Sequence, residues 1–306
     1  MPEASDLDRM AVRRQFDRRV AAHDPAAFLL REVERRMFER LDLVRLEPRR
    51  ILDVGCGTGE GVRRLRARWP KAQVIGLDLS SARVSRAVAI ERPGLGALAQ
   101  SIARRLAGRG GDTPGRYLVG DAHRLPLAAS TFDLVWSNLA FHWFDDPPTA
   151  IGEWYRVVRP EGLLMFSALG VDTLRELRAA GLALPALPDM HDIGDGLVRA
   201  GFAEPVMDTE RLTVTWEDPA RMLGELRGLG GDARRGRRPG LATPRQRDRM
   251  LAELPARLGA VVCGAPLAVT IELIQGHAWC GSAKRLPDGL APIEFRPGAR
   301  SRPRRA

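Results

Sequence analysis

Cysteine is scarce in this chain of 306 residues, and its three copies, Cys56, Cys263 and Cys280, lie far apart. An odd, widely spaced set excludes a disulfide framework. Because no Cys-x-x-Cys pair occurs, the common structural zinc sites are excluded as well. The five histidines are equally scattered and form no His-x-x-x-His pair. We therefore expect no metal site.

Long apolar runs are also missing. None approaches the roughly 20 residues that a helix needs to span a bilayer, and the N-terminal segment MPEASDLDRMAVRRQF lacks the apolar core of a signal peptide. We expect no membrane association, and the cytoplasm is the expected compartment. Hydrophobic residues make up 44% and charged residues 28% of the chain, which favours a globular protein and excludes a wholly disordered one.

Lysine is almost absent too. Lys71 and Lys284 are the only lysines among 48 basic residues, so arginine carries nearly all of the excess that gives a net charge of +10. Residues 231–249 hold seven arginines and two aspartates, and residues 295–306 hold five arginines and no acid. The rest of the chain is neutral, so neither a general basic surface nor a nucleic-acid partner is predicted. The last eleven residues, RPGARSRPRRA, contain proline, glycine and arginine but no large apolar residue, and we expect this tail to be disordered.

Short apolar strands alternate with helical runs between about residues 48 and 170, which predicts a doubly wound, Rossmann-like α/β sheet. The strands expected there are 51–54, 73–77, 117–120, 132–137 and 163–168, and the helices are 60–69, 82–90 and 146–158, with a turn at 159–162. Elsewhere we expect helices at 10–46, 172–180, 193–200 and 219–229, strands at 206–216 and 267–274, and an inserted connection at 91–116 with a helix-like core at 98–106.

A glycine-rich turn follows the first strand of this sheet, with the pattern Asp53-x-Gly55-x-Gly57-x-Gly59. Glycines there let a ligand lie against bare main chain at the N-terminus of the next helix. The dinucleotide pattern Gly-x-Gly-x-x-Gly fails because residue 60 is Glu60, and the P-loop lysine is absent.

Two further acids stand at strand ends. Asp78, 19 residues after Gly59, ends the second strand and could accept both ribose hydroxyls of an adenosyl ligand. Asp121 follows the third strand, where its carboxylate or the N–H of Ala122 could meet the adenine amine. An acid at a strand end often serves only as a helix cap or turn residue. Three acids in register with the glycine turn are far more specific.

Four segments that occur in order are ILDVGCGTGEG, VIGLDLS, YLVGDAHRLPLAASTFDLVWSNLAFHW and EWYRVVRPEGLLMFSA. They resemble the motifs of class I S-adenosylmethionine-dependent methyltransferases. The resemblance implies a seven-stranded, mostly parallel sheet with one antiparallel strand, 267–274 supplying the last member, and S-adenosyl-L-methionine as methyl donor. The cofactor-binding residues that it implies are Asp53, Gly55, Cys56, Gly57, Gly59, Asp78, Leu79, Asp121, Ala122 and Asn138.

Five further segments are RRQFDRRVAAHDPAAFLLREV, SNLAFHW, GVDTLRELRAA, MHDIGDGLVRAGFAEPVMDTERLTVTW and LIQGHAW. They resemble the malonyl-acyl-carrier-protein O-methyltransferases of biotin synthesis, over about residues 11–280. The resemblance implies methylation of the free carboxylate of malonyl-acyl-carrier protein, which gives the malonyl methyl ester that starts pimeloyl-chain synthesis. The chain departs from this family in the expanded 91–116 segment and in the arginine-rich tail.

A carboxylate that arrives ionised needs no general base, but it needs a cation to orient it, and arginine suits this role. The candidates are Arg178 and Arg175, three residues apart on one helix, although either could be a surface arginine. His142 and Trp143 follow the fourth strand, where this fold would place the acceptor, although Trp143 could simply pack in the core. His23 stands where many family members have tyrosine, in a segment that could close over the cofactor or merely dock.

We expect an N-terminal helical lid at 1–47, a methyltransferase domain at 48–285 with a substrate-side appendage at about 170–260, and the basic tail at 286–306. The acidic carrier protein could dock on appendage arginines, unless these belong to a solvated loop. They are Arg234, Arg235, Arg237 and Arg238. Two alternatives stay open: another class I small-molecule or protein methyltransferase, and an assembly factor or hydroxylase that retains the cofactor domain.

Overall fold

The computed structural model describes residues 6–20, 23–91, 115–228, 233–236, 243–258 and 266–281. The helix-like core expected at 98–106 and the tail expected at 286–306 lie outside the described residues, as do Cys263, Arg237 and Arg238. Of residues 23–27 the backbone alone is described.

A seven-stranded sheet with the order β3-β2-β1-β4-β5-β7-β6 runs through the described part of the chain. Its strands are β1 (Arg50–Val54), β2 (Gln73–Asp78), β3 (Arg116–Val119), β4 (Phe132–Ser137), β5 (Val158–Leu169), β6 (Phe202–Trp216) and β7 (Leu267–Cys280). Neighbouring strands from β3 to β5 are parallel, whereas β7 is antiparallel to both β5 and β6. The prediction of a mostly parallel sheet with one antiparallel strand is confirmed.

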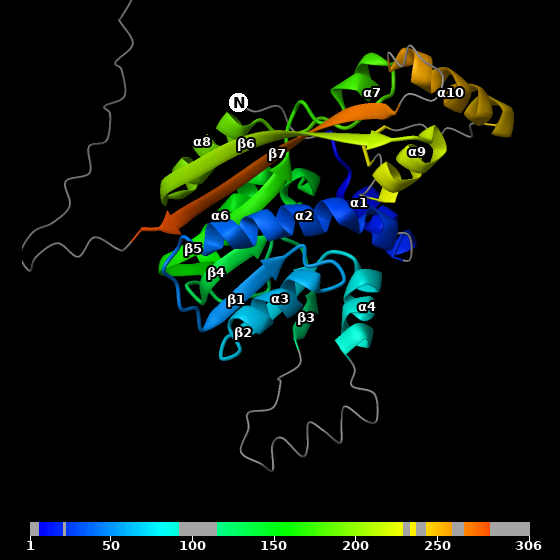
Figure 1. Cartoon of the computed structure of the whole chain (residues 1–306). Coiled ribbons are helices and arrows are strands. Elements are labelled where there is room, and N and C mark those ends of the chain that lie inside the picture. Colours follow the sequence, from blue (N-terminus) through cyan, green and yellow to red (C-terminus); the bar gives the residue numbers. More distant parts are fainter. Residues whose placement is uncertain are drawn as a thin grey trace, which may run out of the picture.

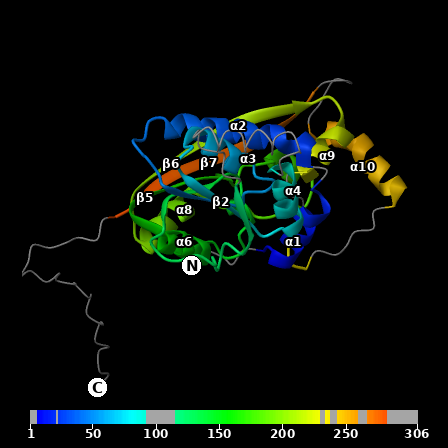
Figure 2. The same cartoon turned by 90° about the horizontal axis from the view of Figure 1, so that it is seen from below.

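Helices cover both faces of the sheet (Figure 1). They are α1 (Arg9–Arg18), α2 (His23–Leu41), α3 (Glu60–Arg68), α4 (Ser81–Glu91), the 3-10 helix η1 (Phe141–Trp143), α6 (Pro147–Val157), α7 (Arg175–Ala179), α8 (Met190–Ala200), α9 (Pro219–Gly228) and α10 (Pro244–Arg257). The sheet separates α2 and α3 from α6 and α8 (Figure 2). Within the described ranges, every helix is too short or too polar to cross a bilayer.

Two apolar layers hold these helices to the sheet. On one face Val33 of α2 packs with Leu134 and Trp136 of β4, and on the other Val135 packs with Trp154 of α6. Because β4 is covered on both faces, all six of its residues are buried, as is usual for a central parallel strand. The two layers fix the strand ends at which β1, β2 and β4 pass into loops.

An appendage extends the molecule beyond the parallel strands. β6 and β7 are longer than predicted and pair with each other as far as Trp216 and Leu267, whereas β5 pairs with β7 only from Leu273 onward. α7, α9 and α10 gather at the free end of this ribbon (Figure 1). They enclose a third apolar cluster that includes Leu177, Trp216, Met222, Leu223, Leu254 and Leu267.

The prediction of one helical stretch over 10–46 is wrong, because the structure divides it into α1 and α2. Pro25 lies in the first turn of α2, where its missing N–H costs nothing. Inside a continuous helix the same proline would remove a hydrogen bond and clash with the preceding turn. A single helix through this proline is therefore unfavourable.

Three other expectations differ from the structure. The helix expected at 172–180 begins only at Arg175, since Leu174 adopts a φ of 57°. The turn expected at 159–162 falls within β5, where Glu161 has a φ of 64°. Helix α10 was not predicted, because its apolar residues, such as Met250 and Leu254, are separated by arginines.

Candidate functional site

The glycine-rich turn forms the floor of a cavity at the carboxyl ends of β1, β2 and β4. Gly57 has a φ of 54°, and a Cβ added there would find its nearest neighbour, the Arg83 Nη1, 3.7 Å away. The main chain at Gly57 is therefore bare toward the cavity. Gly59 instead lets the chain turn into α3, since a Cβ there would lie 2.3 Å from the Tyr117 hydroxyl oxygen. Among the ten residues expected to bind the cofactor, Gly59 alone does not line the cavity.

Asp78 ties the glycine turn to the start of α4. Its Oδ2 accepts a hydrogen bond from the Gly57 N–H at 2.8 Å, and its Oδ1 accepts one from the Ser80 N–H at 2.8 Å. Burial raises the pKa of Asp78, and the Arg83 charge and the two N–H donors oppose that rise. Each carboxylate oxygen keeps a lone pair for a ligand hydroxyl.

Two acids, Asp53 and Glu34, meet at the other end of the cavity. A Cβ on Gly61 would lie 2.6 Å from the Asp53 Oδ2 and 3.2 Å from the Glu34 Oε1, so the two carboxylates face each other over this glycine. Burial, and next the neighbouring Glu34, raises the pKa of Asp53 well above its usual range. Glu34 also accepts a 2.6 Å hydrogen bond from Arg64. Sequence reasoning missed Glu34, because in α2 it resembles any other helix acid.

Asp121 lies under α1 at the adenine end that the motif predicts. Its Oδ2 pairs with the Arg9 guanidinium at 2.6 Å, and its Oδ1 contacts the His123 Nδ1 at 2.6 Å. Burial alone would raise its pKa, but the hydrogen bonds from His123 and Arg9 outweigh burial and lower it. Arg9 also reaches Asp145 at 2.8 Å. Helix α1, with Phe16 in the cavity wall, therefore covers this cavity.

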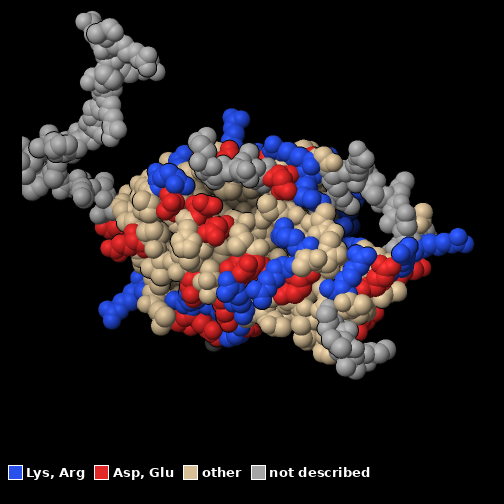
Figure 3. Space-filling view, turned by 90° about the horizontal axis from the view of Figure 1, so that it is seen from above, with Lys and Arg blue, Asp and Glu red and all other residues tan. Residues whose placement is uncertain are grey.

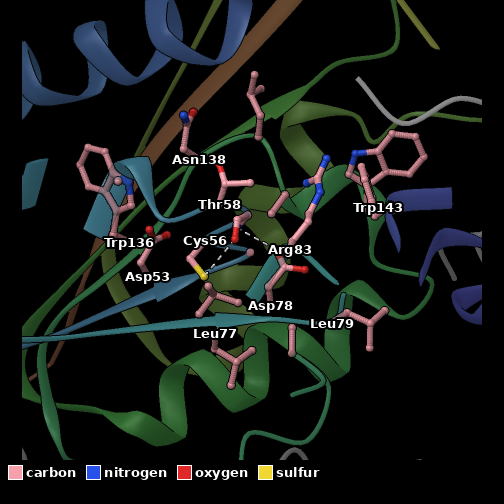
Figure 4. A pocket seen from close by; sticks show the side chains of 18 of the residues that line it. Asp53, Cys56, Thr58, Leu77, Asp78, Leu79, Arg83, Trp136, Asn138 and Trp143 are labelled. Atoms are coloured by element: carbon pink, nitrogen blue, oxygen red, sulfur yellow. Dashed lines mark hydrogen bonds between the residues drawn. The ribbon is translucent and has the colours of Figure 1, made fainter. Parts of the chain in front are cut away.

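Cys56, Leu79, Ala122 and Asn138 complete the part of this wall that the sequence predicted. Burial raises the pKa of the Cys56 thiol well above its ordinary value, so no thiolate is available for nucleophilic attack. The Asn138 amide donates to the Leu30 carbonyl at 3.0 Å and thus joins β4 to α2. Figure 4 shows Asp53 and Trp136 on one side of the cavity and Arg83 and Trp143 on the other.

A second cavity, of about 300 Å³, lies between the parallel sheet and the appendage. Its wall is largely apolar, with leucines from α7, α9 and the loop after α7, and Arg178 belongs to it. Trp143 lines both cavities. Arg175 lines neither of these cavities and lies 3.2 Å from Glu176, so only one of the two candidate arginines reaches this space.

His142 also lines the second cavity, as a neutral side chain. Its Nδ1 accepts a hydrogen bond from the Leu169 N–H at 3.3 Å, and burial lowers its pKa to about 3. His23 is the first residue of α2, and its side chain is not described. Arg234 forms a β-bridge with Leu7, and the Arg235 Nε donates to the Leu7 carbonyl at 2.8 Å.

The sequence around this site matches known proteins. Residues 52–166 match the family model of a methyltransferase domain. Over 304 residues the chain is 45% identical to the malonyl-[acyl-carrier protein] O-methyltransferase of Methylovorus sp. (strain MP688), covering 96% of this chain and 97% of that protein. The chain belongs to the malonyl-[acyl-carrier protein] O-methyltransferase family. A family member from Laribacter hongkongensis (strain HLHK9) is 41% identical, with 98% of this chain and 99% of that protein covered.

A solved structure supports the class I methyltransferase fold. A putative methyltransferase from Bacillus halodurans superimposes with a TM-score of 0.55 at 18% identity, covering 80% of this chain and 99% of that chain. Membership of an O-methyltransferase family makes this chain a methyltransferase, and S-adenosyl-L-methionine is its methyl donor. The first cavity fits that donor: Gly57 offers bare main chain, Asp78 keeps free lone pairs, and Asp53 with Glu34 offers carboxyl oxygens that can accept hydrogen bonds from an ammonium group.

Proposed function

We propose that this protein methylates the free carboxylate of malonyl-acyl-carrier protein and so forms the malonyl methyl ester that starts the pimeloyl chain of biotin. The observation that carries the proposal is that Trp143 lines both cavities, so an acyl group in the appendage cavity adjoins the methyl donor. Two curated relatives that share at least 41% of their aligned residues with this chain carry that substrate in their names.

Methyl transfer requires little of the protein beyond the alignment of the methyl donor with the acceptor carboxylate. S-adenosyl-L-methionine supplies an electrophilic methyl group. An acceptor carboxylate oxygen forms the new C–O bond as the C–S bond breaks, and the electron pair of that bond goes to sulfur. The malonyl carboxylate is ionised at neutral pH, so no side chain has to remove a proton. The chain contributes by holding both reactants in line and by excluding water from the junction.

We assign each binding role to a group whose chemistry fits it. Asp78 takes the ribose hydroxyls, Asp121 or the Ala122 N–H takes the adenine amine, and Asp53 with Glu34 takes the ammonium group. Arg178 orients the acceptor carboxylate, because it brings a planar donor fork to a largely apolar cavity, which Arg19 and Arg227 also line. His142 shapes this cavity as a neutral ring, since burial lowers its pKa to about 3.

The direct test supplies S-adenosyl-L-methionine with a labelled methyl group together with malonyl-acyl-carrier protein. We expect label to appear in an alkali-labile methyl ester on the carrier protein. A protein that binds S-adenosylhomocysteine but transfers no label would contradict the proposal and favour an assembly factor that retains the cofactor domain. Label transfer to other acceptors only would favour a different class I methyltransferase. Rescue of a biotin auxotroph tests the same activity in cells.

The carrier protein also needs a docking surface, and we assign one to the arginines Arg234, Arg235, Arg237 and Arg238. They belong to the sequence that joins α9 to α10, and Arg237 and Arg238 lie outside the described residues. On the face seen from above, the acidic and basic side chains of the described residues are interspersed (Figure 3). Charges at the rim of an interface mainly raise the association rate with an oppositely charged partner.

A further inference from the structure

The cofactor cavity contains a buried cation that none of the roles above uses. Arg83, in the first turn of α4, is 8% exposed and lines the cavity. Within the described residues its Nε has no hydrogen-bond partner, and its guanidinium forms no ion pair with a carboxylate. A buried charge is costly unless a partner compensates it. An unpaired guanidinium that faces a cavity therefore indicates that an anionic group of the ligand binds there.

The carboxylates nearest to Arg83 already accept hydrogen bonds from other donors. The two oxygens of Asp78 accept from the Gly57 and Ser80 N–H groups. Asp17 of α1 accepts from the Ser80 hydroxyl at 2.6 Å and from the Ala82 N–H at 3.2 Å. Both carboxylates therefore stabilise Arg83 through space while leaving its donors free. Burial lowers the pKa of Arg83, and these acids oppose that change.

The position of the guanidinium is fixed from two sides. It lies 4.0 Å from the centre of the Phe16 ring, so α1 covers one of its faces. Its Nη1 lies 3.7 Å from where a Cβ on Gly57 would be, so it stands over the glycine turn. Phe16 in turn meets Trp143 edge to face at 5.3 Å. Figure 4 shows Arg83 on the same side of the cavity as Trp143.

The ligand that we assign to this cavity has a single anionic group. In S-adenosyl-L-methionine the sulfonium and the ammonium are positive and the adenosine is neutral, which leaves the carboxylate of the amino-acid arm. We propose that Arg83 binds this carboxylate, so that the arm enters with its carboxylate toward α4 and its ammonium toward Asp53 and Glu34. The assignment rests on the cofactor site and not on the acceptor, so it can fail while malonyl methylation stands.

Two other arginines line the same cavity and are weaker candidates. Arg9 is engaged by Asp121 at 2.6 Å and by Asp145 at 2.8 Å. Arg31 is exposed, and a hydrogen bond in water is worth less than the same bond in a closed site. Arg31 therefore provides the matched control, since its replacement removes one cavity arginine without emptying the position beside Gly57.

The test measures binding rather than turnover, by calorimetry with two ligands. One is S-adenosylhomocysteine, and the other is its analogue that lacks only the carboxylate. For Arg83→Met we expect the affinity for S-adenosylhomocysteine to fall about 10- to 100-fold, as for loss of a charged hydrogen bond, while the affinity for the decarboxylated analogue changes less than about threefold. For Arg31→Met we expect both affinities to change by less than about threefold.

A second variant covers the case in which Arg83→Met does not fold. Arg83→Lys keeps the charge but loses the planar fork, and we expect a partial loss of affinity for S-adenosylhomocysteine alone. Equal losses for both ligands in the Arg83 variants would show a merely structural role and overturn the proposal. A selective loss for S-adenosylhomocysteine in Arg31→Met, with none in the Arg83 variants, would also overturn it and move the carboxylate to α2.

Discussion

At the scale of single residues, Arg178 and Arg175 form a matched pair that separates recognition from surface charge. They lie on the same short helix, but only Arg178 lines the appendage cavity. We expect Arg178→Met to raise KM for a malonyl thioester at least 10-fold, because the carboxylate loses its charged hydrogen-bond donor. Steady-state kinetics with Arg175→Met as control check this, and equal effects of the two changes would remove Arg178 from its assigned role.

His142 makes stability depend on pH through its burial. The pKa is about 3 in the folded chain against an ordinary 6.5, so between these values the unfolded chain binds one more proton. The contribution is complete above pH 6.5 and is lost as the pH falls toward 3, by about 1.4 kcal/mol per pH unit.

His142→Asn keeps an acceptor for the Leu169 N–H but cannot be protonated. We expect the free energy of unfolding, measured with urea from pH 7 to pH 5, to fall less steeply with acid in this variant than in the parent chain. The slope is the readout, because the smaller side chain also lowers stability at neutral pH. Parallel slopes would mean that folding does not lower the pKa of His142.

At the scale of secondary-structure elements, α1 is held over the cofactor cavity by polar contacts more than by a core of its own. Arg9 joins it to Asp121 and Asp145, and Val12 is its one fully buried apolar residue in the described range. We expect Arg9→Met to speed hydrogen exchange of the α1 amides up to about fivefold, since partly exposed ion pairs contribute up to about 1 kcal/mol.

The control for α1 is Arg13→Met. Arg13 pairs only at 3.7 Å with Asp17 of the same helix, so its loss leaves the contact between α1 and the sheet intact. Exchange measured by mass spectrometry should therefore stay unchanged in this control. If Arg9→Met exchanges no faster than the parent chain, the ion pairs do not hold α1 in place.

At the scale of the whole molecule, the net charge of +10 can attract an acidic partner only where the arginines are concentrated. We expect charge reversal at Arg237 and Arg238 to raise KM for malonyl-acyl-carrier protein several-fold and to leave KM for a short malonyl thioester unchanged. The effect should shrink with added salt, because exposed charges are screened over about 10 Å at 0.1 M.

Reversal at Arg235 serves as the comparison for this docking surface. Its Nε donates to the Leu7 carbonyl and its guanidinium lies 3.5 Å from Asp145, so reversal there also disturbs the segment before α1. We expect it to affect both substrates. Equal effects of the Arg237 and Arg238 reversal on both substrates would refute docking at these arginines.

The cofactor turn was predictable because it is local. Gly55, Gly57 and Asp78 act through main-chain geometry and strand-end positions. Both can be recognised from a pattern that lies within 30 residues of sequence. Arg83 and Glu34 were not, because a lone arginine or glutamate in a helix has the same sequence signature whether it faces water or a cavity. The roles of these two side chains depend on burial against segments far away in the sequence, such as the stacking of Phe16 on Arg83.

By itself, then, the sequence determined the α/β alternation, the glycine turn and the family, since these depend on periodicity and short spacings. Only the tertiary structure decided that β7 enters between β5 and β6. It also decided that Arg178 and not Arg175 lines the appendage cavity, and that α1 covers the first cavity. The physical reason is the same each time: exposure and long-range pairing are properties of the packed chain, and neighbouring residues in sequence do not specify them.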